Sequence, residues 1–321
     1  MRSLTKSPKA FVEMAFQIGQ QGLDPYSHPK SPHKYTQAQL FAILAFKHFL
    51  NTDYRGVIAM LHDWPDIKET LGLKQLPNYS TLKYAQDRLL KKGFAALLDA
   101  SVCAARRLKL IEPEVIAAVD STGYEAGCMS AYFGRRSGQV KHTFPKLATV
   151  CDTRSYLNLS AQASIGPWPD CPSFESLLTR ALERVEITVM LADAGYDSEP
   201  NHEYADVLGV RSIMPPTIGR PPKTGPTGRH RNKLWRRFPK KKYGQRWHVE
   251  GTYSQDKRRF GSQLRSTSVA GQWGELLLRV LVHNTALLLH RQFQAPPNPP
   301  KTYAFNRASD STIRVDQARP K

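Results

Sequence analysis

The chain has 321 residues, of which 46 are Lys or Arg and 27 are Asp or Glu, so its formal net charge is +19. This length suffices for one α/β domain preceded by a helical region, and the charge favours a polyanionic partner such as DNA. The most hydrophobic stretch, 276–289, contains Arg279, His283 and Asn284, which predicts an amphipathic helix and excludes a membrane span. The amino terminus lacks the apolar segment of a signal peptide, so we expect a cytoplasmic protein without a membrane partner.

The cysteines indicate reduced thiols. They stand 20 or more residues apart, at Cys103, Cys128, Cys151 and Cys171. Neither a C-x-x-C nor an H-E-x-x-H motif occurs, so the common zinc-binding patterns are absent from the sequence. In a cytoplasmic protein we expect ordinary core or surface thiols.

Residues 1–112 are predicted to form two parts. In 1–34, Pro and Lys are frequent and the apolar periodicity is weak, which predicts a flexible lead-in. In 35–112, apolar residues recur at helical spacing, which predicts a helical domain. Its helices are expected at 37–50, 54–61 and 81–92, with a break at 63–65.

The third of these helices has two interpretations. Ser80 is expected to cap it, and its exposed face is expected to carry Lys83, Gln86 and Arg88. Such a face fits a DNA groove, as in a helix-turn-helix. The same region also fits a helical bundle that supports a catalytic domain or a dimer contact, and the sequence does not favour either.

From 113 to 292 the pattern is that of an α/β domain. Short β-branched runs predict strands at 115–119, 146–151, 156–164, 187–192 and 211–214. Helices are expected at 173–185 and 198–209, so three strands are followed by helix, strand, helix and strand. The residues after 292 are rich in Pro, Asn, Ser and charge, which predicts a disordered tail over 293–321.

Two of the predicted strands are followed by an acid. Asp120 follows the first strand and Asp193 follows the fourth. Acids just beyond the carboxyl ends of buried strands lie where open α/β sheets place their active sites. Each Asp alone is more often a turn-former or a helix N-cap, so a third feature is needed to favour a site.

That feature is a stripe of charged and phenolic side chains on one helix. Tyr243, Arg246, Glu250 and Lys257 fall within about 60° of one another on an ideal helix. A carboxylate flanked by two cations and a phenol is suited to handling phosphates. The alternative is a solvated helix face with an ordinary Arg–Glu pair, worth about 0.3 kcal/mol.

The three acids together predict a metal site. Carboxylates brought into contact repel one another unless a cation neutralises them, and hard divalent ions with oxygen ligands are the usual solution. We expect Mg²⁺, with Mn²⁺ as the alternative. Two such ions support in-line phosphoryl transfer at a phosphodiester.

These residues resemble the DDE transposases of bacterial insertion sequences, families four and five. The branch in question carries a Y-(2)-R-(3)-E-(6)-K signature, which the chain matches at all four positions of the stripe. The resemblance extends to 120–122, to 193–198 and to 77–81, and it covers most of 35–292. The combination of the signature with two strand-end aspartates is far more specific than any single part.

The resemblance implies an RNase H-like mixed sheet flanked by helices, preceded by a small helical domain. It implies a transposase that binds the terminal inverted repeats of its element as double-stranded DNA, cleaves the 3′ ends and joins them to target DNA. Because two element ends must be handled together, we expect a homodimer on DNA. The implied metal ligands are Asp120, Asp193 and Glu250. The implied contacts to DNA phosphates are Tyr243, Arg246 and Lys257.

The interval between the last two acids departs from one branch of the family. Asp193 and Glu250 are separated by only 56 residues. The best-known members of family four carry a large β-rich insertion there, so the chain is similar to the compact family-five type. A hairpin intermediate in cleavage is therefore not implied.

A basic segment precedes Glu250. Between Asp206 and Glu250 there is no acid, while twelve Lys or Arg residues occur. We expect several of them to bind DNA with a steep salt dependence. These candidates are Arg236, Arg237, Lys240, Lys241 and Lys242. The interleaved rings of Trp235, Phe238 and Trp247 stack on bases or pack in the core, and packing is favoured for Trp247.

Other polar residues have simpler interpretations. Asp152 is expected in a turn and Asp197 as a helix cap, while Asp256 points away from Glu250 by about 120°. His142 and His248 are expected to contact phosphates or to pack. Ser121 has no evident His and Asp partners, so a serine recombinase is disfavoured.

Two other functions remain compatible with the residues. A chain of this fold can be a nuclease that cuts without joining, since the same carboxylates support both reactions. It can also be a catalytically inactive DNA-binding protein derived from a transposase, which the intact acid triad disfavours.

Overall fold

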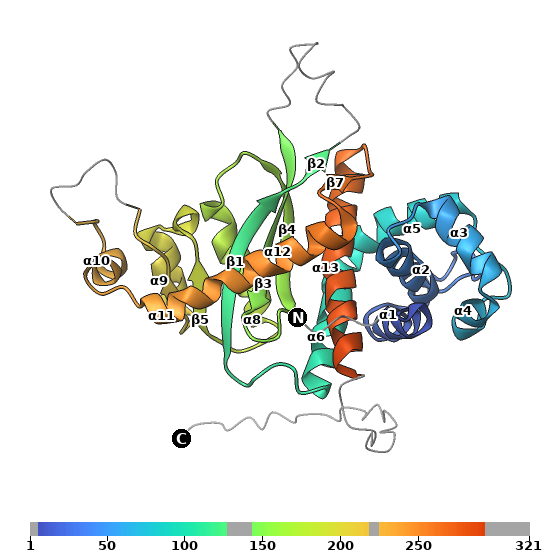
Figure 1. Cartoon of the computed structure of the whole chain (residues 1–321), viewed down its shortest axis with the longest axis horizontal. Coiled ribbons are helices and arrows are strands. Elements are labelled where there is room, and N and C mark those ends of the chain that lie inside the picture. Colours follow the sequence, from blue (N-terminus) through green and yellow to red (C-terminus); the bar gives the residue numbers. More distant parts are fainter. Residues whose placement is uncertain (1–5, 127–142, 218–224, 293–321) are drawn as a thin grey trace, which may run out of the picture.

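The computed structural model of the chain describes residues 6–126, 143–217 and 225–292. Its amino-terminal part is helical (Figure 1). The helices are α1 Pro8–Gly22, α2 Gln37–Phe49, α3 Tyr54–Asp63, α4 Pro65–Thr70, α5 Tyr79–Lys92 and α6 Phe94–Arg107. The predicted tail at 293–321 lies outside the described residues.

Within the lead-in predicted to be flexible over 1–34, residues 8–22 instead form helix α1. Phe11, Ala15 and Ile18 recur at helical spacing and are buried. The side chain of Ser7 caps the helix, and α1 packs against α2 and α6. The surrounding Pro and Lys residues obscured an apolar stripe that is only a few turns long.

Helix α5 begins earlier than predicted, because Asn78 and not Ser80 caps it. The Asn78 side chain accepts a hydrogen bond from the backbone N–H of Ser80 at 3.1 Å. Gln86 was expected to be exposed but is buried, and it accepts a hydrogen bond from the Tyr54 hydroxyl at 3.0 Å. Lys83 is exposed as expected. The packing of α3 on α5 therefore removes one of the residues predicted to face a DNA groove.

The rest of the chain folds around a five-stranded sheet. Its strands are β1 Val115–Gly123, β3 Phe144–Asp152, β4 Asn158–Gly166, β5 Ile187–Ala192 and β6 Arg211–Ile213. They lie in the order β4-β3-β1-β5-β6, with β3 antiparallel to both neighbours and β1, β5 and β6 parallel to one another. This is the mixed sheet of an RNase H-like fold, so the expected fold class is confirmed.

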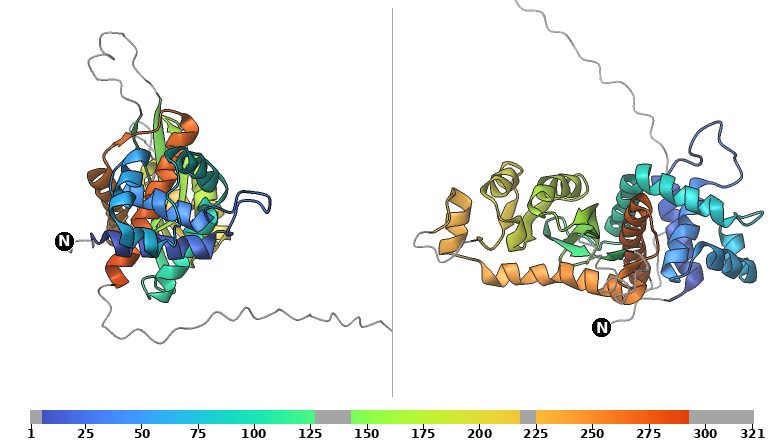
Figure 2. Two further views of the ribbon diagram at one scale, coloured as in Figure 1. Left: turned by 90° about the vertical axis from the view of Figure 1, so that its right-hand side faces the viewer. Right: turned by 90° about the horizontal axis from the view of Figure 1, so that it is seen from above.

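Helices cover both faces of the sheet (Figure 2). One face carries α8 Phe174–Leu182 and α9 Glu199–Val207, and α12 Trp247–Phe260 crosses the other. Between β6 and α12 the chain forms α10 Arg229–Arg236, α11 Lys240–Tyr243 and the 3-10 turn η3 Gly244–Arg246. Outside the sheet, β2 Glu125–Ala126 pairs with β7 Gln263–Leu264. In the described residues between 193 and 250 there is no β-rich insertion.

The alternation of side chains decides which face each acid occupies. Val119 belongs to the core beneath α8 and α9. Ala118 and Leu191 belong to the core on the opposite face, which includes buried residues of α12. Successive residues of a strand point to opposite faces. Asp120 and Asp193 therefore lie on the side of the sheet that α12 covers.

Helix α13 Val269–Gln292 joins the amino-terminal helices to the sheet, and both share one hydrophobic core. The prediction of an amphipathic helix at 276–289 was wrong, because Arg279, His283 and Asn284 are buried. Asn284, for example, donates a hydrogen bond to the backbone carbonyl of Asn158 at 2.9 Å. The polar groups of α13 thus bind other parts of the chain. Among the described residues, no helix combines the length and the apolar character needed to cross a membrane.

Candidate active site

The two aspartates lie at the same level on neighbouring parallel strands, although β1 continues past Asp120 to Gly123 and so does not end before the acid as predicted. The register pairs Val119 with Ala192, so Asp120 and Asp193 follow side by side. The Asp120 carboxylate accepts a hydrogen bond from the Ser121 N–H at 2.8 Å. Asp193 accepts one from the Gly195 N–H at 3.0 Å and so also shapes the turn after β5.

Glu250 comes to this place on the first turn of α12. Arg246, just before the helix, forms ion pairs with two carboxylates. Its Nη1 lies 3.5 Å from Oδ2 of Asp120, and its Nη2 donates a hydrogen bond to Oε1 of Glu250. The expected i,i+4 pair is therefore present, and the same guanidinium also connects α12 to the end of β1.

The electrostatics show that the acids influence one another. Burial raises the pKa of Asp120 to about 6, the charges of Asp193 and Glu250 add to this, and the Ser121 N–H and Arg246 oppose it. Burial also raises the pKa of Tyr243, with contributions from the charges of Asp193 and Asp120. The structure thus gathers all three predicted acids around Arg246 and Tyr243.

The raised pKa of Asp120 predicts a pH-dependent stability. A carboxyl group whose pKa is higher in the folded than in the unfolded protein stabilises the fold at low pH, and this contribution is lost as pH rises through about 6. Asp120→Asn should therefore raise the free energy of unfolding at pH 7.5, in EDTA, by on the order of 2 kcal/mol. At pH 5, between the ordinary pKa of an Asp and the raised pKa of about 6, the difference should be about half as large. Thermal unfolding at both pH values tests this, and a variant less stable than wild type at pH 7.5 would contradict it.

The other two members of the stripe lie on either side of Glu250. The Arg246 guanidinium lies 5.8 Å from the ring centre of Tyr243. Lys257 Nζ donates a hydrogen bond to Oγ1 of Thr122 at 2.7 Å. The stripe does not form one uninterrupted α-helix, because Tyr243 ends α11 and η3 separates it from α12. Its members nevertheless face the same side.

An open groove of about 520 Å³ lies between β1 and α12. It includes two of the predicted acids and Lys257. Its lining consists of Asp120, Ser121, Thr122, Glu250, Tyr253, Ser254, Lys257, Arg258 and Ser262. Serine and threonine hydroxyls next to Lys and Arg can donate hydrogen bonds to phosphate oxygens.

Tyr253 is a residue of this site that the sequence did not indicate. Its hydroxyl lies 2.6 Å from the carbonyl oxygen of Asp120, 2.8 Å from Oγ1 of Thr149 and 3.0 Å from the Thr149 N–H. The side chain is buried between the helix and the sheet. It therefore fixes the distance between α12, which carries Glu250, and β1 at Asp120. Its position three residues after Glu250, on the same helix face, was the available signal.

Tyr253→Phe is expected to lower the rate of the reaction at this site about 10- to 100-fold, because it removes only the hydroxyl that holds the acid-bearing elements together. The free energy of unfolding should fall by about 1–2 kcal/mol, since the partners of the hydroxyl remain buried. Cleavage kinetics and urea unfolding measure the two effects. Unchanged cleavage in a folded variant would show that the hydroxyl has no positioning role.

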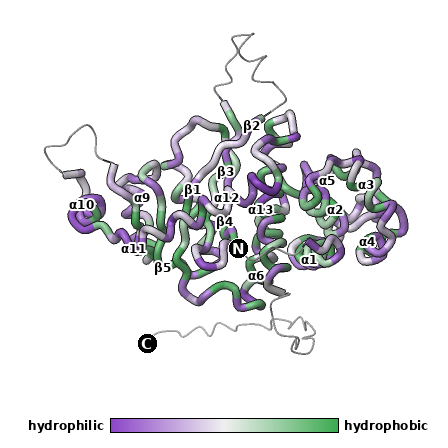
Figure 3. The backbone as a smooth tube through the Cα atoms, viewed as in Figure 1, coloured by the Kyte–Doolittle hydropathy of each residue, from purple (hydrophilic) through white to green (hydrophobic). Residues whose placement is uncertain are grey.

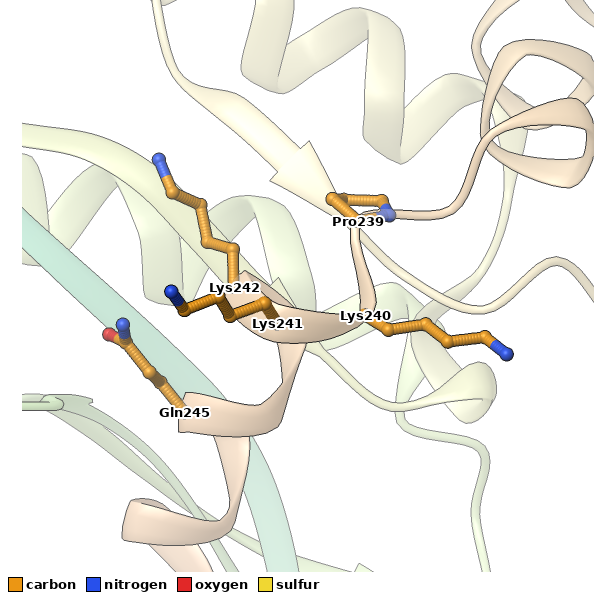
Figure 4. A pocket seen from close by; sticks show the side chains of 5 residues that line it. All are labelled: Pro239, Lys240, Lys241, Lys242 and Gln245. Carbon is orange, nitrogen blue, oxygen red and sulfur yellow. The ribbon is translucent and has the colours of Figure 1, made fainter.

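The basic segment lies beside the site on α10 and α11, where hydrophilic residues gather (Figure 3). Arg236, Arg237, Lys240 and Lys241 are exposed and Lys242 is half-buried. Lys240, Lys241 and Lys242 line a shallow hollow of about 460 Å³ with Pro239 and Gln245. Figure 4 shows that Lys240 points away from Lys241 and Lys242, so the three amines spread over a wide surface.

Two tryptophans near the basic segment are exposed, one of them against expectation. Trp247 was predicted to pack in the core, but 57% of it is exposed. It stacks on His248, with ring centres 4.3 Å apart. Trp235 is 48% exposed. Phe238 packs edge-on against Tyr243 at 5.0 Å, as the packing interpretation expects.

The remaining acids have structural roles. Asp152 accepts hydrogen bonds from the backbone N–H groups of the turn that follows β3, as predicted. Asp197 was expected to cap α9, but Ser198 does so, and Asp197 forms an ion pair with Arg231 at 2.8 Å. Asp256 is buried and accepts hydrogen bonds from residues outside α12, so it does not join the site.

Of the His and Ser candidates, His248 and Ser121 lie within the described residues. The ring of His248 lies 4.9 Å from that of Tyr156, and burial lowers its pKa. Ser121 lines the groove, and its N–H binds Asp120. His142 and Cys128 lie outside the described residues. Cys151 is buried, and burial raises the pKa of its thiol.

The donor chemistry of the site fits a hard divalent cation. Three carboxylates share one face of the sheet, and burial and mutual repulsion raise the pKa of Asp120. Such a cluster favours a cation with oxygen ligands. In the part of the chain that the structure describes, no three Asp, Glu, His or Cys side chains are close enough to hold an ion as they stand. Arg246 supplies the positive charge between two of them.

The fold and the site define a class of protein, namely enzymes that carry acidic residues on an RNase H-like sheet. The sequence pattern of the family described as "Transposase DDE domain" matches residues 111–285, which is more than half of the chain. The chain belongs to this family and is a DDE transposase, an enzyme of DNA transposition. The resemblance found in the sequence is thereby confirmed at the level of the family.

Solved structures and curated proteins add little to this assignment. Two structures are similar to the chain, "Crystal structure of a pre-cleavage Mos1 transpososome" and "Mos1 transposase paired-end complex with left transposon end". Each is 11% identical, with coverage of 74% of this chain and 80% of that chain and a TM-score of 0.22. No curated protein matches the sequence.

Proposed function

We propose that this transposase binds the terminal inverted repeats of its own element, cleaves the DNA at their 3′ ends and joins these ends to target DNA. The observation that carries the proposal is the juxtaposition of three acids. Asp120 lies in the carboxyl-terminal half of β1, Asp193 directly follows the neighbouring parallel strand β5, and Arg246 pairs with both Asp120 and Glu250. The sequence motifs alone did not require these residues to meet.

In this proposal Asp120, Asp193 and Glu250 hold Mg²⁺, with Mn²⁺ as the alternative. When bound, such ions activate an attacking hydroxyl and stabilise the departing oxygen of a phosphodiester. The protein's own residues hold the strand that reacts. Arg246 and Lys257 neutralise phosphate charge on either side of Glu250, and Tyr243 orients a phosphate.

Both proposed reactions follow the same scheme. The oxygen of water or of a hydroxyl group gives up its proton and forms a new P–O bond as the opposite P–O bond breaks, and the departing oxygen takes up a proton. Water is the attacking group in cleavage, and the released 3′-hydroxyl attacks target DNA in joining. In cleavage the P–O bond that breaks is replaced by a bond to the oxygen of water, and in joining it is replaced by a new phosphodiester bond. Because both steps replace one P–O bond by another, one set of carboxylates serves both.

A strand-transfer assay tests the proposal. Duplex oligonucleotides that end in the inverted repeat are incubated with the protein, Mg²⁺ and a supercoiled plasmid. We expect oligonucleotides covalently joined to the plasmid through their 3′ ends. Cleaved ends without joined products would favour the nuclease. Binding without cleavage would favour the inactive DNA-binding protein.

We further propose that the enzyme acts as a homodimer on DNA in the bacterial cytoplasm. Two element ends must be joined to one target, and a twofold arrangement provides two equivalent sites with one kind of interface. Sizing of the protein with and without inverted-repeat duplexes tests this. A single protomer holding both ends in one complex would overturn it.

The basic segment is expected to bind phosphates without reading bases. Arg236→Ala combined with Arg237→Ala should lower the affinity for all duplexes alike and reduce the salt slope by about one unit for each lost contact. Titration of two unrelated duplexes at several salt concentrations measures both effects. Arg180→Ala, at an exposed residue of α8 outside the basic segment, is the control. A loss confined to one duplex would mean that the segment reads sequence.

A further inference from the structure

A second cationic site lies apart from the catalytic groove. A pocket of about 780 Å³ opens between α10 on one side and α9 and β6 on the other. Its charged and polar lining consists of His202, Asp206, Arg211, Ser212, Arg229, His230, Lys233 and Arg237. Its apolar lining consists of Val210, Leu234, Phe238 and Pro239, with Gly209 beside them.

The helix that forms one wall of the pocket is firmly anchored. The Glu199 carboxylate accepts hydrogen bonds from the N–H groups of His230 at 2.7 Å and Arg231 at 3.1 Å, at the start of α10. The Arg231 side chain pairs with Asp197, which is inaccessible to solvent. Leu234 of α10 lines the pocket and is itself buried against the core. The pocket is therefore preformed and does not depend on a bound partner.

The contacts that anchor α10 engage the nearby acids, so the lining of the pocket carries an excess of positive charge. Glu199 and Asp197 are engaged by α10 itself. Asp206 lies 3.9 Å from Nε2 of His230. Among the described residues, no acid forms an ion pair with the four remaining cations of the lining. These are Arg211, Arg229, Lys233 and Arg237.

The topology separates this pocket from the catalytic groove. The strands β1, β5 and β6 are parallel, and Asp120 and Asp193 lie toward the carboxyl ends of the first two. The pocket is lined by 209–212, at the amino end of β6. Pro239 lines both the pocket and the hollow of Lys240, so a basic surface continues from the pocket to α11.

We propose that this pocket binds a phosphodiester segment of the DNA on which the enzyme acts, at a distance from the strand held in the catalytic groove. The four cations would neutralise phosphates, and the apolar wall would accept the faces of sugars. This proposal rests on the proposed function, because the polyanion is taken to be the DNA substrate. The pocket would provide a second contact to DNA, which a short duplex is not long enough to reach.

Charge reversal at Lys233 tests the proposal. Affinities are measured for a series of inverted-repeat duplexes of increasing length on either side of the cleavage site. Wild type should gain affinity as the duplex becomes long enough to reach the pocket. Lys233→Glu should bind the shortest duplexes as wild type does, lose most of that gain and show a salt slope lower by about one unit or more on long duplexes. Lys233→Arg should retain the gain.

The control is Arg180→Glu, which makes the same change of net charge on an exposed residue of α8. It should leave the length dependence intact. An equal loss of affinity for short and long duplexes in Lys233→Glu, or no loss for either, would overturn the proposal that the pocket binds DNA. This experiment measures binding alone, and the proposed function is tested by the joining of DNA. Failure of the wild-type enzyme to join DNA would therefore refute the proposed function and leave the role of the pocket to be decided by the binding data.

Discussion

Asp120→Asn is expected to abolish DNA cleavage while the affinity for inverted-repeat duplexes stays within about twofold of wild type. The substitution keeps the size of the side chain but replaces one carboxylate oxygen by an uncharged amide. Even the loss of an outer-shell partner of a metal ligand costs about 10- to 100-fold, so the loss of a ligand should cost more. Affinity should persist because the cations on α10, α11 and α12 are unchanged. Cleavage of labelled duplexes and a binding titration measure the two effects.

The control for this prediction is Asp66→Asn, which changes an exposed carboxylate of α4 far from the groove. It should cleave as wild type does. If Asp120→Asn cleaved DNA at a rate similar to wild type, Asp120 would not be a ligand, and the site would have to be sought among other acids. If it lost affinity instead, the acid would act through the arrangement of Arg246, with which it pairs.

Arg279→Ala is expected to have the largest effect on stability. Arg279 is 1% exposed and lies within 3.5 Å of carboxylate oxygens of both Asp256 and Glu275. It also donates a hydrogen bond to the carbonyl oxygen of Gly261 at 2.7 Å. Removal of the guanidinium leaves two buried carboxylates without their cation, which costs about 3–5 kcal/mol. This is a large part of the total stability of an ordinary domain, about 5–15 kcal/mol.

Urea unfolding measures this effect, and the midpoint should fall strongly or the variant should fail to fold. Arg258→Ala is the matched control, because its guanidinium binds only Ser254 within the same helix. That change should cost no more than about 0.5 kcal/mol. A loss below about 1 kcal/mol for Arg279→Ala would mean that the buried ion pairs contribute little, as well-packed apolar replacements sometimes show.

The position of Arg279 also explains why the amino-terminal helices and the sheet are expected to unfold together. Helix α13 contacts both, and its buried arginine binds Asp256 of α12 and the loop that leads to β7. Tyr124, just after β1, donates a hydrogen bond to the same Asp256 at 2.8 Å. The helix that carries Glu250 is thus held at its far end by this network.

The strands of the sheet, and their succession along the chain, followed from local sequence patterns. The runs that end near Asp120 and Asp193 are apolar and β-branched, and such runs form central strands wherever helices cover both faces. The three strands before α8 and the two strands after it appear where they were predicted, with ends shifted by a few residues. Strand ends are the least certain feature because hydrogen bonding, and not side-chain pattern, decides them.

The elements that were missed depend on contacts between distant residues. The burial of Arg279 requires Asp256, 23 residues away, and that of Asn284 requires Asn158, 126 residues away. No local pattern reports such pairs, so α13 was expected to be amphipathic. Helix α1 was missed for a related reason, since its apolar stripe gains stability only from packing on α2 and α6.

The sequence predicted which residues belong to the candidate site but did not predict how they are arranged. The spacing of Arg246 and Glu250 indicated an i,i+4 pair, and the structure shows that pair. It did not indicate that the same guanidinium reaches Asp120, since that contact depends on how α12 crosses the sheet. The hydroxyl of Tyr253 sets this crossing by binding the backbone of β1. The roles of these residues in the reaction remain predictions.

The most direct test of the account is a change of metal preference. Asp193→Cys replaces an oxygen ligand by a thiolate, which binds Mg²⁺ poorly and softer ions such as Mn²⁺ better. If Asp193 holds the ion, the variant should fail to cleave inverted-repeat duplexes in Mg²⁺ and should recover activity in Mn²⁺, while wild type is active in both. Cleavage by the variant in Mg²⁺ at the wild-type rate would contradict the assignment of the acids as metal ligands.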